Sequence, residues 1–193
     1  AVGCGYKYLN GGPGAPAFLY AAPRHHGGFR QPLSGWFGHR DPFEFTPQYD
    51  AAGDIGQYLC GTPPVLSMVA LDAALDVWEG VNMTALRAKS QALTGYFIEL
   101  VETRCAGHGL TLISPRDPDS RGSQISFTHA EGGYAIISAL IAEGVIGDFR
   151  APDVLRFGFT PLYTSFADVW HAVDRMAAIM NERRWDKPEF HAR

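Results

Sequence analysis

The chain has 193 residues, of which 46% are hydrophobic and 19% are charged, and its formal net charge is −4. This composition can bury a core and argues against intrinsic disorder. The acidic balance, without a clustered basic face, excludes nucleic acid as the expected partner.

Residues 1–80 hold most of the glycine and proline and predict few regular elements. One short strand is expected over residues 17–21. Thr62, followed by two prolines, is expected to cap an apolar helix that runs through about residue 78. Apolar residues cover more than one face of this helix, which predicts burial on most sides. Because residues 1–80 have too few regular elements to form a domain alone, and the chain starts at Ala1 rather than at Met, we expect them to be the end of a larger domain.

Residues 81–193 predict a small, compact α/β domain. A helix over residues 83–105 carries one apolar stripe and is followed by strands over residues 110–114 and 124–128. A helix over 133–143, strands over 145–149 and 154–159, and a last helix that starts at Thr164 or Ser165 complete the pattern.

The cysteines, Cys4, Cys60 and Cys105, are widely spaced and show neither a disulfide framework nor a metal-binding spacing. We therefore expect reduced thiols and a cytoplasmic protein. No apolar run is long enough to cross a bilayer, and no signal peptide is visible. His25-His26, and His39 with Asp41, could suggest a metal, but the neighbouring histidine pair is poorly arranged to share one ion, so no metal is expected.

A lysine between two tyrosines, Tyr6-Lys7-Tyr8, runs into a glycine-rich turn that ends at Gly14. Aromatic surroundings favour the neutral amine, which forms Schiff bases with carbonyls such as the aldehyde of pyridoxal phosphate (PLP). The glycines would let the backbone approach a ligand closely. The alternative is a surface lysine before a turn.

Gly61 and Thr62 precede the expected apolar helix, where free N–H groups and a hydroxyl suit a phosphate; the alternative is an ordinary helix cap. Trp36 and Phe37 lie between glycines in a loop, which is typical of a ligand wall or partner contact. The alternative there is a loop anchored in its own core.

Arg156 is embedded in an apolar strand and needs a partner, because a buried unpaired charge is costly. A substrate carboxylate held by the guanidinium fork would serve. An internal Asp or Glu would serve equally well.

Together these segments resemble kynureninase, a PLP enzyme of the aspartate-aminotransferase fold (fold type I). The resemblance runs in order along essentially the whole chain, through residues 5–14, 31–39, 58–62, 147–148 and 156–163. It implies that residues 1–80 end the large PLP-binding domain and that residues 81–193 form the small C-terminal α/β domain.

The resemblance also implies a role for each matched residue. Lys7 would hold PLP as the internal aldimine and move protons, and Tyr6 would bind the phosphate and assist proton transfer. Trp36, Gly61 and Thr62 match phosphate-side positions, and Arg156 matches the arginine that grips the substrate α-carboxylate. The implied partner is a second copy of the chain, in a homodimer whose subunits share the active site.

The implied reaction hydrolyses L-kynurenine or 3-hydroxykynurenine to anthranilate or 3-hydroxyanthranilate and L-alanine, in tryptophan catabolism and NAD biosynthesis. Kynureninases carry a further cofactor domain ahead of the lysine, so we expect the isolated 193-residue stretch to be inactive. The alternatives are another fold-type-I enzyme, such as a cysteine desulfurase or an aminotransferase-like lyase, and a non-catalytic binding module of residues 81–193.

Overall fold

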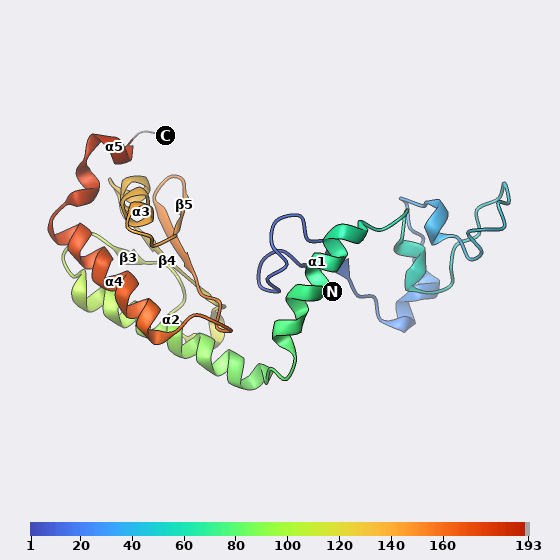
Figure 1. The fold of residues 1–193 in the computed structure, drawn as a ribbon, viewed down its shortest axis with the longest axis horizontal. Coiled ribbons are helices and arrows are strands. Elements are labelled where there is room, and N and C mark those ends of the chain that lie inside the picture. Colours follow the sequence, from blue (N-terminus) through green and yellow to red (C-terminus); the bar gives the residue numbers. More distant parts are fainter. Residues whose placement is uncertain (192–193) are drawn as a thin grey trace. The chain divides into compact units, whose positions relative to one another are not determined.

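The computed structural model describes residues 1–191, and its contacts divide the chain into two compact units. The first unit is Ala1–Gly80 and the second begins at Val81. Figure 1 shows the first unit from blue to green and the second from green to red.

The first unit has little regular structure. Strand β1 (Val2–Cys4) pairs antiparallel with β2 (Ala17–Leu19), with Val2 opposite Leu19. The expected strand over residues 17–21 is thus present but shorter, and its partner β1 was not predicted. Short 3-10 helices follow, and the unit ends with one α-helix and a last 3-10 turn. These elements are η1 (Pro23–Gly28), η2 (Trp36–Gly38), η3 (Ile55–Tyr58), α1 (Val65–Leu75) and η4 (Asp76–Trp78).

Thr62 does not cap helix α1, so that prediction is wrong. The helix begins at Val65, and its N-cap is Pro64, which offers no side-chain hydrogen bond. A residue that precedes a proline is disfavoured in the helical region. Because Thr62 and Pro63 each precede a proline, the chain enters the helix only after Pro64.

The predicted burial of α1 is also wrong for the described residues. No residue of this helix is buried, and Leu66 and Val69 are 88% and 61% exposed. The first unit supplies too little apolar surface to cover more than one side of the helix. Leu71, which is half-buried, is the side chain that α1 presents to the loop after β1.

The second unit is built on a four-stranded antiparallel sheet in the order β3-β4-β6-β5. Its strands are β3 (Thr111–Leu112), β4 (Gln124–Thr128), β5 (Asp148–Arg150) and β6 (Val154–Gly158). Its helices are α2 (Met83–Arg104), η5 (Pro118–Ser120), α3 (Gly133–Ala142), α4 (Phe166–Asn181), η6 (Arg184–Asp186) and α5 (Pro188–His191).

Two strands differ from the sequence prediction. The strand expected over residues 110–114 is reduced to β3. The strand expected over 145–149 begins only at Asp148, because the Val145 N–H bonds back to the Leu140 carbonyl at the end of α3, 2.9 Å away. The residues just before β5 are therefore used to terminate a helix.

The long helices of this unit are capped by side chains. Asn82 accepts a hydrogen bond from the Ala85 N–H at the start of α2. At the start of α4, Ser165 and Asp168 form a reciprocal capping box, which confirms the prediction that this helix starts there.

The core lies on one face of the sheet. Strand alternation turns Phe127 of β4 and Leu155 and Phe157 of β6 toward this face, where helices α2, α3 and α4 pack. Phe97 of α2 lies at the centre, with its ring centroid 5.1 Å from that of Phe157. The opposite face of β4, β5 and β6 carries polar side chains, including Ser126, Arg156 and Asp148. The mixed α/β class is as predicted.

Candidate functional site

The loop after β1 carries Lys7 and is closed by its own backbone. The Gly5 N–H donates to the Pro16 carbonyl and the Gly11 N–H to the Gly5 carbonyl, each at 3.0 Å. Within the loop the Asn10 N–H donates to the Lys7 carbonyl at 2.9 Å. Lys7 therefore starts a hydrogen-bonded turn at the edge of the β1–β2 pair.

The glycines of this loop do two different things. A Cβ on Gly5 or Gly11 would lie 2.9 Å or 2.8 Å from a methyl carbon of Leu71, so these two glycines let the loop pack on α1. Gly12 and Gly14 have positive φ angles of 72° and 95° and face open space. Of the glycines that the sequence predicted to approach a ligand, Gly11 is used for close packing on Leu71 by the protein itself.

Tyr6 and Lys7 are both exposed, and the Lys7 Nζ lies 5.1 Å from the centroid of the Tyr6 ring. The Asn10 Nδ2, in the same turn, is buried without a hydrogen-bond partner among the described residues. The exposed Lys7 side chain carries a primary amine, which is the group that a lysine uses to hold the aldehyde of PLP as a Schiff base. These residues therefore fit the attachment point of the cofactor.

A second group of predicted residues meets at the start of η2. A Cβ on Gly61 would lie 3.8 Å from Trp36 Nε1, so the structure brings Trp36 and Gly61 together. Gly35 allows this, because a Cβ there would lie 1.8 Å from the Cys60 carbonyl oxygen. Thr62 is exposed next to Gly61. This corner offers an indole N–H, a backbone N–H and a hydroxyl.

The Trp36 side chain is 49% exposed, and its ring lies 4.8 Å from that of Phe37 in an edge-on arrangement. A hollow of about 410 Å³ beside it is lined by Trp36, His39 and Tyr49 together with residues of the 41–48 segment. The loop that carries Trp36 is thus not anchored in a core, and it borders a hollow.

Arg156 lies on the polar face of the sheet in the second unit. Its partner is Asp148 on the neighbouring strand, to which the guanidinium Nη2 donates. Of the two partners that the sequence left open, the structure supplies the internal carboxylate. The Arg156 Nε is buried without a partner, and the side chain as a whole is 30% exposed.

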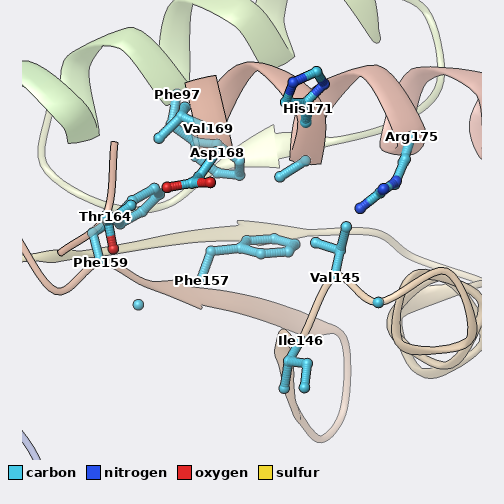
Figure 2. A pocket seen from close by; sticks show the side chains of 13 residues that line it. Phe97, Val145, Ile146, Phe157, Phe159, Thr164, Asp168, Val169, His171 and Arg175 are labelled. Atoms are coloured by element: carbon cyan, nitrogen blue, oxygen red, sulfur yellow. The ribbon is translucent and has the colours of Figure 1, made fainter. Parts of the chain in front are cut away.

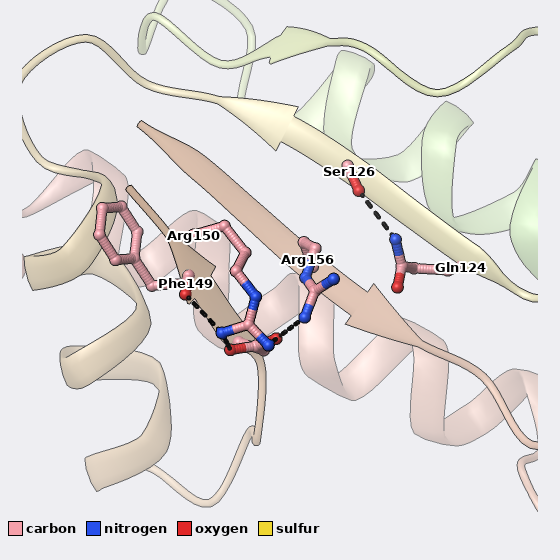
Figure 3. A network of polar contacts seen from close by, with 6 residues as sticks. Gln124, Ser126, Phe149, Arg150 and Arg156 are labelled. Atoms are coloured by element: carbon pink, nitrogen blue, oxygen red, sulfur yellow. Dashed lines mark hydrogen bonds and ion pairs between the residues drawn. The ribbon is translucent and has the colours of Figure 1, made fainter. Parts of the chain in front are cut away.

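The sequence did not assign a role to the neighbours of Arg156. Arg150 Nη1 donates to Asp148 Oδ1 at 3.2 Å, and Figure 3 shows Arg150 and Arg156 on the same face, with Ser126 and Gln124 on the next strand. Only the strand register places these side chains together, and no local pattern encodes it.

A groove of about 460 Å³ lies on the other side of β6, against α4 (Figure 2). Phe157 and Phe159 form its apolar wall, and Asp168, His171 and Arg175 line it from α4. Hydrogen bonds from Ser165 hold the pKa of the Asp168 carboxyl below its usual value. None of the predicted site residues lines this groove.

The three cysteines are unpaired and differ in exposure. Burial raises the pKa of the Cys105 thiol to about 11, which suppresses the reactive thiolate. Cys60 is exposed, and its Sγ donates to the Leu33 carbonyl at 2.8 Å.

Residues 1–191 contain neither a membrane-spanning helix nor a metal-binding cluster. No helix there is both long and apolar enough to cross a membrane. No group of three or more His, Cys, Asp or Glu side chains in that range could hold a metal ion.

Comparison with known proteins places these features in a family context. The family model described as the kynureninase C-terminal domain matches residues 86–176. Kynureninases of Burkholderia mallei (strain SAVP1) and Burkholderia pseudomallei (strain K96243) are each 54% identical over 193 residues, and that of Pseudomonas fluorescens is 52% identical. Each match covers the whole chain and 46% of the relative. The chain thus spans about half the length of the curated relatives it matches, and it matches their C-terminal half.

Solved structures share the fold at low sequence identity. A cysteine desulfurase from Thermococcus onnurineus NA1 superimposes with a TM-score of 0.73 at 17% identity, over 94% of this chain and 46% of that one. A C-DES mutant with glycine covalently linked to its PLP cofactor gives a TM-score of 0.60 at 17% identity, over 85% of this chain and 43% of that one. The fold is that of the C-terminal part of fold-type-I PLP enzymes, as predicted.

Proposed function

We propose that this chain belongs to the kynureninase family and provides the C-terminal half of a PLP-dependent kynureninase, because it is 54% identical to kynureninases over all 193 residues and residues 86–176 match the kynureninase C-terminal domain. The reaction is the hydrolytic cleavage of the Cβ–Cγ bond of L-kynurenine, or of 3-hydroxykynurenine. Water and kynurenine give anthranilate and L-alanine, and the hydroxylated substrate gives 3-hydroxyanthranilate. The observation that carries the proposal is the 54% identity to kynureninases over all 193 residues.

In this proposal the first unit holds the cofactor, as the end of the large domain. Lys7 Nζ binds the PLP aldehyde and later carries a proton, and the Tyr6 hydroxyl donates to the phosphate and assists the proton transfer. Trp36 Nε1, the Gly61 N–H and the Thr62 hydroxyl are the further phosphate donors. The exposure of Lys7 and the contact between Trp36 and Gly61 support these assignments. When bound, PLP supplies an electron sink for the bond cleavage.

In the second unit, the small C-terminal domain, Arg156 binds the α-carboxylate of the substrate. An arginine fork matches a carboxylate in two parallel hydrogen bonds. The partial exposure of the Arg156 side chain, of which Asp148 engages only Nη2, supports this role.

We also propose a homodimer whose subunits share the site, in the cytoplasm, acting in tryptophan catabolism and NAD biosynthesis. The exposed apolar side chains of α1, such as Leu66, support a second covering surface. The unpaired cysteines suit a reducing compartment. The isolated 193-residue chain is expected to be inactive, because the relatives carry about as much chain again before the matched part.

The test is a peptide mass map of the natively isolated protein after borohydride reduction. A phosphopyridoxyl mass is expected on the peptide that contains Lys7. In the complete protein, Lys7→Ala should remove this mass and nearly all kynurenine turnover, whereas Lys187→Ala, at an exposed lysine of the second unit, should change neither.

A parallel assay with L-cysteine as the substrate separates this proposal from a cysteine desulfurase. The similarity of this chain to such an enzyme is one of fold, at 17% sequence identity. An unmodified Lys7 in a verified complete chain supplied with PLP would refute the proposal.

A further inference from the structure

The polar face of the second unit carries a row of three side chains that lie directly opposite one another. Strand register pairs Ser126 of β4 with Arg156 of β6, and Arg156 with Asp148 of β5. Directly opposed residues of antiparallel strands have their side chains on the same face and in reach of each other. Arg156 is therefore held in the middle of a three-strand row.

Asp148 is the hydrogen-bond partner of the Arg156 guanidinium, and no other is found among residues 1–191. Its Oδ2 accepts from Arg156 Nη2, and Arg150 also holds it, with Nη1 3.2 Å from Oδ1 and Nη2 3.2 Å from Oδ2. Within residues 1–191 no acceptor is found for the other Arg156 donors, and the Nε among them is buried.

The charged side chains at and beside this row favour the binding of an anion. Arg150, Asp148 and Arg156 together carry a net charge of +1, because one carboxylate lies between two guanidinium groups. Arg150 thus offsets the repulsion that Asp148 would otherwise exert on an incoming carboxylate. Asp148 occupies one N–H of a group that has five, so a two-point contact to a ligand carboxylate remains available.

We propose that Asp148 is a positioning residue for Arg156: it fixes the guanidinium plane so that the unused N–H groups face the α-carboxylate of an amino-acid ligand. The inference rests on the proposed function, to which it adds a residue and its role. A long arginine side chain on a sheet surface has many rotamers, and a fixed fork binds a carboxylate more tightly than a mobile one.

The chain contains a matched control for this pair. Arg104 and Asp174 join α2 and α4 with nearly the same side-chain exposures, 31% and 47%, as Arg156 and Asp148, 30% and 46%. Each arginine also has one buried nitrogen without a partner. The Arg104–Asp174 pair joins two helices and lies away from the polar sheet face. Breaking it therefore shows how much alanine binding changes when an ion pair is lost anywhere else in the second unit.

The experiment uses the complete PLP-loaded enzyme and measures the dissociation constants of L-alanine and of L-alaninamide, which lacks the carboxylate, from the absorbance of the bound cofactor. Asp148→Ala is expected to reduce the preference for alanine by about ten-fold, the effect of losing about one charge-assisted hydrogen bond. With kynurenine, KM should rise by a similar factor and kcat should change less. Asp174→Asn should leave the preference for alanine unchanged.

Asp148→Asn keeps the size and one acceptor oxygen and should give a smaller loss, which guards against a variant that fails to fold. An unchanged or larger preference in both Asp148 variants would overturn the proposal, because Asp148 would then be a competitor of the ligand. If the complete enzyme binds alanine but does not turn over kynurenine, the proposed function fails while the role of Asp148 is still decided by the alanine preference.

Discussion

The two units of this chain differ in how much apolar surface they bury. In the first unit three residues are buried, Gly5, Gly38 and Gln57, and none has a large apolar side chain. In the second unit a continuous cluster joins three helices to one face of the sheet, and Leu93, Ile125, Leu140 and Leu155 are fully buried there. The second unit is thus held together by an apolar core, and the first unit by backbone hydrogen bonds and turns.

The difference explains where the candidate functional residues lie. Lys7, Trp36 and Gly61 are in the unit without a core, in loops whose shape depends on glycine and on short hydrogen bonds. Arg156 is on a strand of the unit with a core, and its position is fixed by the sheet. We infer that the second unit can hold its candidate site by itself, and that the first unit needs further covering surface to hold its own.

The largest expected effect is the difference between the two units as separate polypeptides. Residues 81–193 should unfold in one cooperative transition, because they contain the whole buried cluster. Residues 1–80 should show no cooperative transition. Circular dichroism during heating checks both, and a sharp transition of the 1–80 fragment would refute the contrast.

The cysteines should report the same contrast in the intact chain. Iodoacetamide at pH 8 should modify exposed Cys60 at once, whereas Cys105 should react only after unfolding, at least about a hundred-fold more slowly, because it is buried and its pKa is raised to about 11. Mass spectrometry of timed samples measures both rates. Similar rates for the two thiols would mean that the core of the second unit opens readily.

The same leucine-to-alanine substitution should have different effects on stability in α1 and α2. Leu93→Ala, at a fully buried position of α2, should lower the free energy of unfolding by about 2–5 kcal/mol. Leu66→Ala, at an 88% exposed position of α1, should change it by less than about 0.5 kcal/mol in the 193-residue chain. Urea denaturation gives both values.

The outcome at Leu66 also tests whether a further surface covers α1 in the complete protein. In the complete protein the same substitution should become costly if a second surface covers α1. A Leu66→Ala variant that is as stable as the wild type there would show that this side of the helix stays uncovered.

Much of the second unit could be predicted from the sequence, because its signals are local. The single apolar stripe of α2 and the Ser165 cap of α4 each require only a few neighbouring residues. The pairing of Arg156 with Asp148 could not be predicted, because it depends on the register of β5 with β6. The sequence placed that strand three residues too early, since residues 144 and 145 are used to end α3.

The first unit was harder to predict for a physical reason. The apolar residues of α1 indicate burial, but the surface that would bury them is not among the described residues. Lys7 and Trp36 were singled out by their local sequence, whereas the roles of Lys7, Tyr6 and Trp36 in holding the cofactor come from the resemblance to a family and are proposals. Gly5 and Gly11 show the limit of the motif, since their contact with Leu71 could not be foreseen from spacing.

The smallest expected effect concerns the helix caps of the two units. Ser165→Ala removes a side-chain acceptor from the first turn of α4 and should cost about 1 kcal/mol of unfolding free energy. Thr62→Ala is the matched control and should cost nothing, because Pro64 and not Thr62 precedes α1. Urea denaturation at pH 7 gives the cost of Ser165→Ala in the second unit. Far-ultraviolet circular dichroism compares the helix content of the two variants, and a loss of helix signal in Thr62→Ala would contradict the helix start at Val65.

The Ser165 cap should also give the second unit a dependence on acid. Hydrogen bonds from Ser165 lower the pKa of Asp168 from its ordinary value of 3.8, so the ionised carboxylate is favoured in the folded state. Its contribution is present above pH 3.8 and is lost as the pH falls through the lowered folded value. The stability difference between wild type and Asp168→Asn should therefore shrink below pH 3.8, whereas α1, which has no side-chain cap, has no such term. A difference that stayed constant across this range would mean that the Asp168 side chain stabilises α4 through its shape rather than its charge.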